Sequence, residues 1–394
     1  MKKGFWVSLT AAASIWAAGR VHATDIVIYR IGDGSTALVN TGNPVFVDDY
    51  SYNSTLHTAS LVGSVPMPTT ASGANKQLIA SGVATSEGML TVSPDGQSIV
   101  VTGYARDLGG SGSLSSTAGA TVNRTVGIVA TATGAVNTST ALTDFADGNN
   151  PRSAAYDGTN VWVAGGAGGV RATTVGATTS TQLSTTVTNI RQVNLFASQL
   201  YVSDSSGSAV RLGTVGSGTP TTSGQTITNL PGFPTSGSPY QFFFADLSPN
   251  VAGVDTLYVA DDTTSGLPGG ITKFSLDAGS WVNKGTFGTA ADAYRGLTGI
   301  ANGDGSVTLF STRKGGSAAA GGGELVSLDD SSGYDAFPGA APTINLLATA
   351  ANQEAFRGVG VISASIPVPE PASCLLAGFG LIGLAAFARR HSPA

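Results

Sequence analysis

The sequence predicts an all-β protein, a β-propeller of six blades, from three observations. Strand-length apolar segments alternate with Gly, Asp and Asn turns along the body of the chain. A loose repeat of these segments returns roughly every 40 to 60 residues, the length of a propeller blade. The chain also contains 54 glycines and only 11% charged residues, which favours short strands and many turns over helices.

Five repeats are complete. The clearest two, 190–216 and 240–279, each contain an apolar strand, a turn, a second strand (LYVSD or LYVAD), a Gly-rich turn and a third strand, followed by a Thr-rich fourth. Apolar alternation with turn residues between strands is typical of antiparallel meanders. The same pattern predicts blades at 88–145, from Pro151 and from Tyr294.

The sixth blade is split between the two ends of the body. The segment FRGVGVIS, from Phe356, has the pattern of an innermost strand, whereas DIVIYRIGDG, PVFVDDYS and HTASLVGSV supply three strands without an innermost partner. Joining them closes the circle and leaves no open terminal edge. Seven blades is the alternative, because the first repeat is long enough to contain extra strands.

The N-terminus has the pattern of a secretory signal peptide. Lys2 and Lys3 precede a short apolar run, and Val21-His22-Ala23 fits a small-residue cleavage site. We therefore expect a signal peptide at 1–23, a propeller domain at 24–366 and a separate C-terminal segment at 367–394.

Cysteine and histidine are too scarce for most catalytic sites. Cys374 is the one cysteine of the chain and lies in the C-terminal segment, and His57 is the one histidine between the two end segments. This composition excludes disulfides, Cys-based zinc sites and multi-His metal sites in the body. It favours a non-enzyme with no catalytic residues, with a carboxylate-based hydrolase, lyase or lactonase as the alternative.

The body is acidic. Residues 24–368 contain 14 basic and 23 acidic side chains, a net charge of −9, without basic runs. We therefore expect no nucleic-acid partner.

Aligning the repeats on their innermost strands places four arginines and two other polar residues at matching positions. Matching positions of the blades surround the channel, so these side chains are expected at one mouth of it. Arginine forks bind carboxylate, sulfate or phosphate through two hydrogen bonds, which predicts an anion site. The alternative is that ion pairs with Glu87 and nearby Asp residues join the blades. The six residues are Arg152, Arg191, Arg295, Arg357, Glu87 and Gln241.

No cofactor is expected. Asp48, Asp204 and Asp261 each follow a second strand, and calcium bound by the latter two is an alternative to hydrogen bonds with turn amides. The run Phe242-Phe243-Phe244 is expected to pack between blades rather than form one sugar-stacking surface, because successive strand residues point to opposite faces.

The C-terminal segment has three parts. Val368-Pro369-Glu370-Pro371 is expected to be extended, because proline restricts its own φ and the residue before it. Residues 374–388 are 15 apolar residues, about 22 Å as a helix, which is short for a hydrocarbon core of ~30 Å. We expect a transmembrane-like helix there, with Arg389 and Arg390 on the cytoplasmic side.

This order resembles a PEP-CTERM sorting signal. The resemblance implies that exosortase, a protease of Gram-negative bacteria that produce exopolysaccharide, recognises Pro369, Glu370 and Pro371. The LYVSD and LYVAD repeats resemble NHL-type propeller repeats over about two blades. Together these observations predict a propeller held at the inner membrane by its tail and then released or attached at the cell surface or extracellular matrix. There it is expected to bind an acidic polysaccharide or another envelope component.

Overall fold

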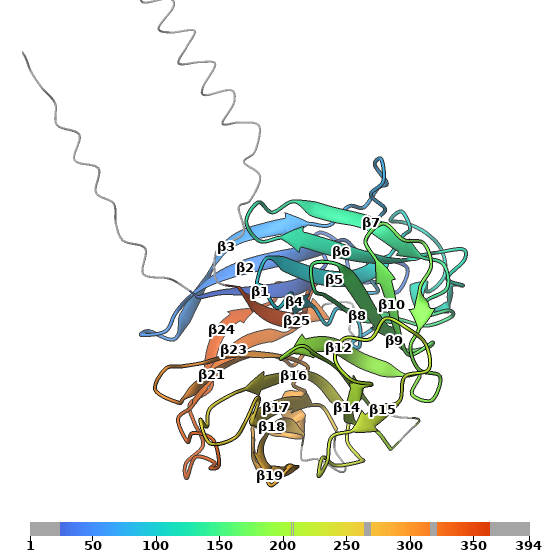
Figure 1. Ribbon diagram of the computed structural model, residues 1–394. Helices are drawn as coiled ribbons and strands as arrows, with labels where there is room; N and C mark the ends of the chain where they lie inside the picture. Colours follow the sequence, from blue (N-terminus) through green and yellow to red (C-terminus); the bar gives the residue numbers. More distant parts are fainter. Residues whose placement is uncertain (1–23, 206, 208, 264–268, 316–320, 363–394) are drawn as a thin grey trace, which may run out of the picture.

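The computed structural model describes residues 24–205, 207, 209–263, 269–315 and 321–362 (Figure 1). Their strands form six sheets, five of four strands and one of five, arranged in a circle. The described residues contain two 3₁₀ turns, Leu114–Ser116 and Ala290–Asp292, and no α-helix. The prediction of an all-β, six-bladed propeller is confirmed, and the seven-bladed alternative is wrong.

Blades are numbered from the sheet that contains the N-terminal strand. Blade 1 contains β1 (Thr24–Ile31), β2 (Val45–Asn53), β3 (Thr58–Pro66), β22 (Gly321–Gly322) and β25 (Glu354–Ile362). Blade 2 contains β4 (Thr91–Val92), β5 (Ser98–Tyr104), β6 (Arg124–Ala130) and β7 (Val136–Leu142). Blade 3 contains β8 (Pro151–Tyr156), β9 (Asn160–Gly165), β10 (Val170–Thr174) and β11 (Thr181–Gln182).

The other three blades follow in chain order. Blade 4 contains β12 (Ile190–Phe196), β13 (Gln199–Asp204), β14 (Leu212–Val215) and β15 (Ile227–Asn229). Blade 5 contains β16 (Pro239–Ala245), β17 (Thr256–Asp261), β18 (Gly270–Asp277) and β19 (Ser280–Phe287). Blade 6 contains β20 (Gly296–Ala301), β21 (Val307–Arg313), β23 (Glu324–Asp330) and β24 (Asn345–Thr349).

Blade 1 closes the circle as the sequence predicts. Strand β25, from the end of the body, pairs antiparallel with β1, so that Ile28 lies opposite Val359. The innermost strands around the channel are therefore β25, β4, β8, β12, β16 and β20. A feature that the repeat does not predict is β22, which adds a short parallel pairing to β25.

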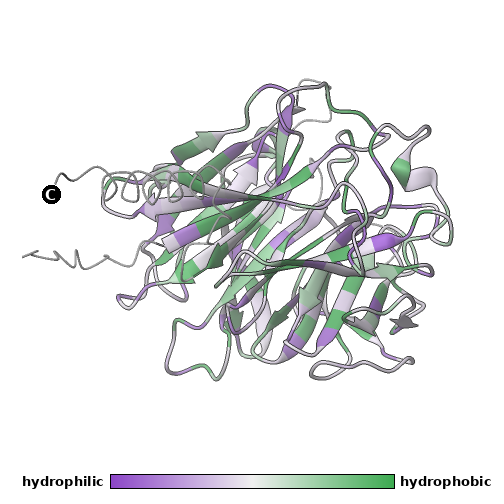
Figure 2. Ribbon diagram, turned by 90° about the horizontal axis from the view of Figure 1, so that it is seen from above, coloured by the Kyte–Doolittle hydropathy of each residue, from purple (hydrophilic) through white to green (hydrophobic). Residues whose placement is uncertain are grey.

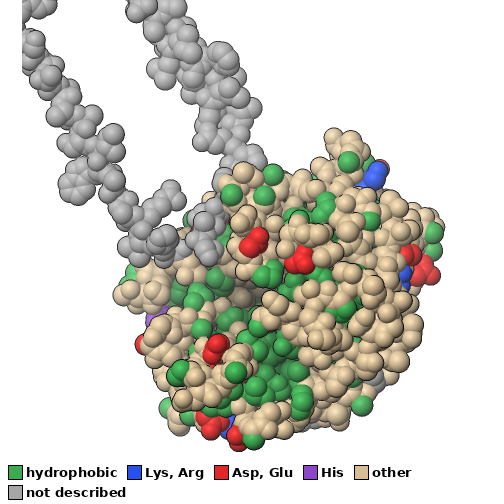
Figure 3. All heavy atoms as spheres, viewed as in Figure 1, with side chains coloured by type: hydrophobic (Ala, Val, Ile, Leu, Met, Phe, Trp, Pro, Cys, Tyr) green, Lys and Arg blue, Asp and Glu red, His purple; other side chains and the backbone are tan. Residues whose placement is uncertain are grey.

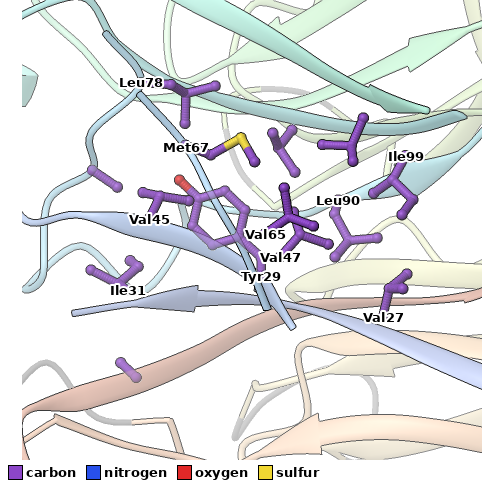
Figure 4. Close-up of a cluster of buried hydrophobic side chains, with 14 of the residues drawn as sticks. Val27, Tyr29, Ile31, Val45, Val47, Val65, Met67, Leu78, Leu90 and Ile99 are labelled. Atoms are coloured by element: carbon purple, nitrogen blue, oxygen red, sulfur yellow. The ribbon is translucent and has the colours of Figure 1, made fainter. Parts of the chain in front are cut away.

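The hydrophobic core lies between the faces of neighbouring blades. Hydrophobic and hydrophilic residues alternate along many strands, as Figure 2 shows. At the junction of blades 1 and 2, Val27, Tyr29 and Val47 pack with Leu90 and Ile99 (Figure 4). The buried Tyr29 hydroxyl donates a hydrogen bond to the carbonyl oxygen of Thr102, 2.9 Å away. The blade that closes the circle is thus joined to its neighbour by both apolar packing and a hydrogen bond.

Charged side chains are sparse on the surface. Figure 3 shows hydrophobic side chains near the middle of the face in view, with a few acidic side chains around them. No helix in the described part of the chain has the length and apolar character needed to cross a membrane. The expected signal peptide, the 374–388 helix and the sorting residues Pro369, Glu370, Pro371, Arg389 and Arg390 lie outside the described residues.

Candidate functional site

The predicted arginines lie where innermost strands leave regular pairing. Register shifts pass over Arg152 in β8 and Arg191 in β12, so each occupies a β-bulge at the start of its strand. A third shift passes over Tyr240 and Gln241 in β16. Because a bulge leaves one residue outside the ladder and redirects its side chain, these positions can point toward the channel mouth.

Backbone hydrogen bonds between blades define the matching positions. The N–H of Gln241 donates to Arg295, that of Met89 to Arg152 and that of Gly358 to Gly88, at 2.9–3.1 Å. The matching of blades from the sequence is therefore one residue out of register in two of them. The matching position is occupied by Tyr240 instead of Gln241 in blade 5 and by Gly88 instead of Glu87 in blade 2. The six ring residues, called the arginine ring below, are Arg357, Gly88, Arg152, Arg191, Tyr240 and Arg295.

Arg152 and Arg191 have neutral partners. Arg152 is 7% exposed and donates from Nη1 to Asn189 Oδ1 at 2.5 Å and to the Ile190 carbonyl at 3.0 Å. Arg191 donates to the hydroxyls of Ser205 and Tyr240, each at 2.9 Å. Within the described residues, no carboxylate oxygen lies within 4.0 Å of either guanidinium, and the buried Nε of Arg152 has no hydrogen-bond partner.

Burial, and then the positive charge of Arg191, lower the pKa of Arg152 to about 10, although Tyr240 and the carboxylates of Glu87 and Asp204 oppose the decrease. The two guanidinium groups are therefore close enough to repel each other. A negatively charged ligand group between them would offset the repulsion and could accept a hydrogen bond from the Nε–H of Arg152.

Tyr240 separates two of the arginines. Its ring centre lies 4.5 Å from the guanidinium carbon of Arg191 and 5.5 Å from that of Arg295. Such cation–π contacts contribute about 0.5 to 2 kcal/mol and keep the planar groups in place. The sequence analysis missed Tyr240 because it placed the next residue, Gln241, at the matching position of blade 5.

Arg295 and Arg357 are held more firmly by the protein. Arg295 forms an ion pair with Asp262, with Nε and Oδ2 2.9 Å apart, and donates to the Gly315 carbonyl. Arg357 is 2% exposed and donates from Nη2 to the Gly82 carbonyl at 3.2 Å. Burial, and then the charge of Arg295, lower the pKa of Arg357 to about 10.

Glu87 lies between blades with neutral hydrogen-bond donors. Its carboxylate accepts hydrogen bonds from the Ser81 backbone N–H, the Tyr104 hydroxyl and the Asn150 amide. Burial raises the pKa of this carboxyl, and these hydrogen bonds oppose the increase. Gly88 takes the ring position because a Cβ there would come within 2.7 Å of the Tyr29 ring.

Gln241 crosses the channel. Its Nε2 donates to the Leu90 carbonyl at 2.8 Å, while its Oε1 accepts from the N–H groups of Val359 at 2.9 Å and Leu297 at 3.2 Å. The side chain of a blade 5 residue thus bonds to blades 2, 1 and 6. These bonds occupy the amide oxygen and one amide hydrogen, so this residue joins four blades.

The other candidates have structural contacts. Asp48 forms an ion pair with Arg30 at 2.5 Å, and Asp261 accepts hydrogen bonds from the N–H groups of Ser238 and Thr263. Asp204 is fully buried at the end of β13. The described residues contain no group of three His, Cys, Asp or Glu side chains arranged for a metal ion.

The phenylalanine run divides between two surroundings. Phe242 and Phe244 are buried against Tyr201 of blade 4, as the packing prediction requires. Phe243 is partly buried and packs on the opposite side, against the cluster between blades 5 and 6.

Comparisons with known proteins identify the C-terminal segment. Residues 367–390 match the model of the PEP-CTERM protein-sorting motif. No curated protein matches the chain.

Several solved structures resemble the body at low identity. The periplasmic gluconolactonase of Pseudomonas aeruginosa is 14% identical, with a TM-score of 0.41 and 83% of each chain covered. A chain of a nidogen/laminin complex is 11% identical, with a TM-score of 0.44, covering 86% of this chain and 99% of that one. A putative oxidoreductase (glucose dehydrogenase) of Thermus thermophilus is 12% identical, with a TM-score of 0.36 and coverages of 70% and 91%. The chain is thus a six-bladed β-propeller that carries a PEP-CTERM sorting motif, which indicates an exported protein processed by exosortase.

Proposed function

We propose that this protein is a non-catalytic binding component of the cell surface or extracellular matrix, and that its arginine ring binds an acidic polysaccharide. The sorting motif supports a location at the cell surface or in the extracellular matrix, because PEP-CTERM proteins are processed by exosortase. In this proposal the precursor is held in the inner membrane of a Gram-negative cell by residues 374–388. Exosortase then recognises Pro369, Glu370 and Pro371 and frees the propeller from its anchor.

One observation carries the ligand assignment. Arg152 and Arg191 repel each other and donate hydrogen bonds only to neutral groups among the described residues. The attraction of Glu87 and Asp204 does not offset the lowered pKa of Arg152, although acidic side chains outnumber basic ones in the chain by 24 to 19. A protein with carboxylates in excess could neutralise these groups internally. A carboxylate of a uronic acid would instead accept hydrogen bonds from both guanidinium groups.

Calorimetric titration of the purified full-length protein with oligogalacturonate tests this proposal. The wild-type protein should bind, with an affinity that falls as salt concentration rises. The double variant Arg191→Gln/Arg295→Gln should bind at least about tenfold more weakly, a loss of 1.4 kcal/mol or more.

The matched control is Arg171→Gln, which removes an arginine paired with Asp144 on blade 3, away from the ring. This variant should bind like the wild type. Equal affinities of the wild type and the double variant would overturn the proposed anion site.

A further inference from the structure

The channel has a second, chemically different end. A cavity of about 450 Å³ lies at the far ends of the innermost strands, on the other side of Gln241 from the arginine ring. This volume falls within the range of small-ligand pockets, roughly 300 to 1,000 Å³. Its walls come from blades 1, 2, 4, 5 and 6 and include Phe196, Phe243, Asn194, Thr298, Val361 and Asp95.

Two aromatic rings form one wall. Phe196 of blade 4 and Phe243 of blade 5 are both partly buried, with ring centres 6.3 Å apart and planes at 75°. Gly299 lets Phe243 lie against β20, since a Cβ there would come within 2.8 Å of the ring. The two rings thus present apolar surface to the cavity at a steep angle to each other, so a ligand can lie on the face of one ring and touch the other.

Polar groups without protein partners complete the site. The amide Nδ2 of Asn194 and the hydroxyl of Thr298 form no hydrogen bond with the described residues, while Asn194 Oδ1 accepts from the Leu195 N–H. They can therefore donate to, or in the case of Thr298 also accept from, a ligand hydroxyl.

The cavity contrasts with the arginine ring in charge. None of its lining residues is Lys, Arg or His, and Asp95 is the one ionisable side chain among them. Asp95 accepts hydrogen bonds from the Ser93 hydroxyl and the Gln97 N–H, which lower its pKa and keep it ionised at neutral pH. No basic side chain of the lining can pair with an anionic group and the Asp95 carboxylate opposes one, so the cavity favours a ligand without negative charge.

We infer that this cavity is a binding site for a neutral carbohydrate, with one pyranose ring seated against Phe196 and Phe243. The apolar C–H face of the sugar covers the aromatic wall, and its hydroxyls bond to Asn194 and Thr298. This site is independent of the proposed anion site, because the hydrogen-bonded Gln241 side chain lies between them. The protein then has two carbohydrate sites of opposite selectivity.

Calorimetric titration of the full-length protein with neutral oligosaccharides, namely cello-, manno- and galacto-oligosaccharides, tests the inference. At least one series should bind, with an affinity that does not depend on salt. Phe243→Leu should weaken binding about tenfold. Because that change also alters packing, Thr298→Phe provides a second variant, which fills the cavity from a partly exposed position and should abolish binding.

Two control variants show whether the neutral sugar binds in this cavity or elsewhere on the propeller. Thr58→Val, on the exposed outer strand β3, should bind neutral sugars like the wild type. Arg191→Gln/Arg295→Gln should also retain neutral-sugar binding, even if it loses oligogalacturonate. The inference is overturned if none of the three series binds, if binding survives Thr298→Phe, or if a long-chain fatty acid occupies the cavity instead.

Discussion

The side-chain amide of Gln241 donates a hydrogen bond to the Leu90 carbonyl oxygen across the channel, 2.8 Å away. Blades 2 and 5, which carry these residues, lie opposite each other in the circle. The innermost edge of each blade has backbone groups without a neighbouring strand, and buried backbone groups of this kind need partners. One glutamine therefore satisfies three of them and divides the channel into two compartments.

Replacing Gln241 should destabilise the whole propeller. Gln241→Met keeps the length of the side chain but leaves the Leu90 carbonyl and the N–H groups of Leu297 and Val359 without this partner. The free energy of unfolding, measured by urea denaturation, should fall by about 3 kcal/mol. Gln97→Met at an exposed turn should change it by less than about 0.5 kcal/mol. A Gln241→Met protein as stable as the wild type would show that water replaces the amide at no cost.

Closure of the circle through β1 and β25 should dominate stability. Ile28 is fully buried at this junction and lies opposite Val359. Ile28→Ala should lower the free energy of unfolding by about 2 to 5 kcal/mol, because it leaves a cavity where the two chain ends meet. Val62→Ala, 48% exposed on β3, provides the comparison and should have little effect. Similar losses in both variants would contradict a closing role for β1.

Asp261 should make the protein less stable as pH rises from about 4 to 6. Burial raises its pKa to about 6, whereas in the unfolded chain it is about 3.9. In this interval the folded state retains a proton that the unfolded state releases, so the free energy of unfolding falls by about 2 to 3 kcal/mol.

Urea denaturation between pH 4 and 6 measures this contribution. Asp261→Asn keeps an oxygen acceptor for the turn amides but cannot ionise. In this variant the free energy of unfolding should therefore fall by about 2 to 3 kcal/mol less between pH 4 and 6 than in the wild type. Asp304→Asn, in an exposed turn where hydrogen bonds from Ser306 lower the pKa, should leave the decrease unchanged. The same pH dependence in wild type and Asp261→Asn would refute the assignment.

Lys273 and Asp330 form a fully buried ion pair between blades 5 and 6, with Nζ and Oδ2 2.7 Å apart. Burial would raise the pKa of Asp330, but hydrogen bonds from Lys273, Ser332 and Tyr258 outweigh it and lower the pKa. Lys273→Met should cost about 3 to 5 kcal/mol, because it leaves a buried charge without its counter-ion. The double variant Lys273→Met/Asp330→Leu should recover most of that lost stability, as measured by thermal denaturation. A double variant as unstable as Lys273→Met would mean that packing, rather than the unpaired charge, causes the loss.

The repeat pattern and the turn residues were sufficient to predict the blades. Apolar alternation placed the complete blades, and the unmatched strands at the two ends of the body predicted their union in blade 1. In two Asp-Gly turns, Asp33 and Asp304 accept hydrogen bonds from the N–H groups of Ser35 and Ser306. The strands and turns depend on neighbouring residues in the sequence, and the union of the chain ends follows from counting unmatched strands, so both could be predicted.

The register of the candidate site could not be predicted in the same way. A β-bulge adds one residue to a strand without changing its apolar pattern. The sequence therefore does not reveal that the following positions are shifted by one residue. This shift concealed Tyr240 as a ring residue. The roles of Gln241 and Phe243 were also hidden, because their partners lie on blades that are remote in sequence.

The most direct test of the proposed anion site is an experimental structure of the protein with galacturonate bound. The proposal predicts the sugar carboxylate at the arginine ring, with its oxygens about 3 Å from guanidinium nitrogens of Arg152 and Arg191. An empty ring at saturating galacturonate, or a carboxylate bound only elsewhere on the propeller, would contradict it.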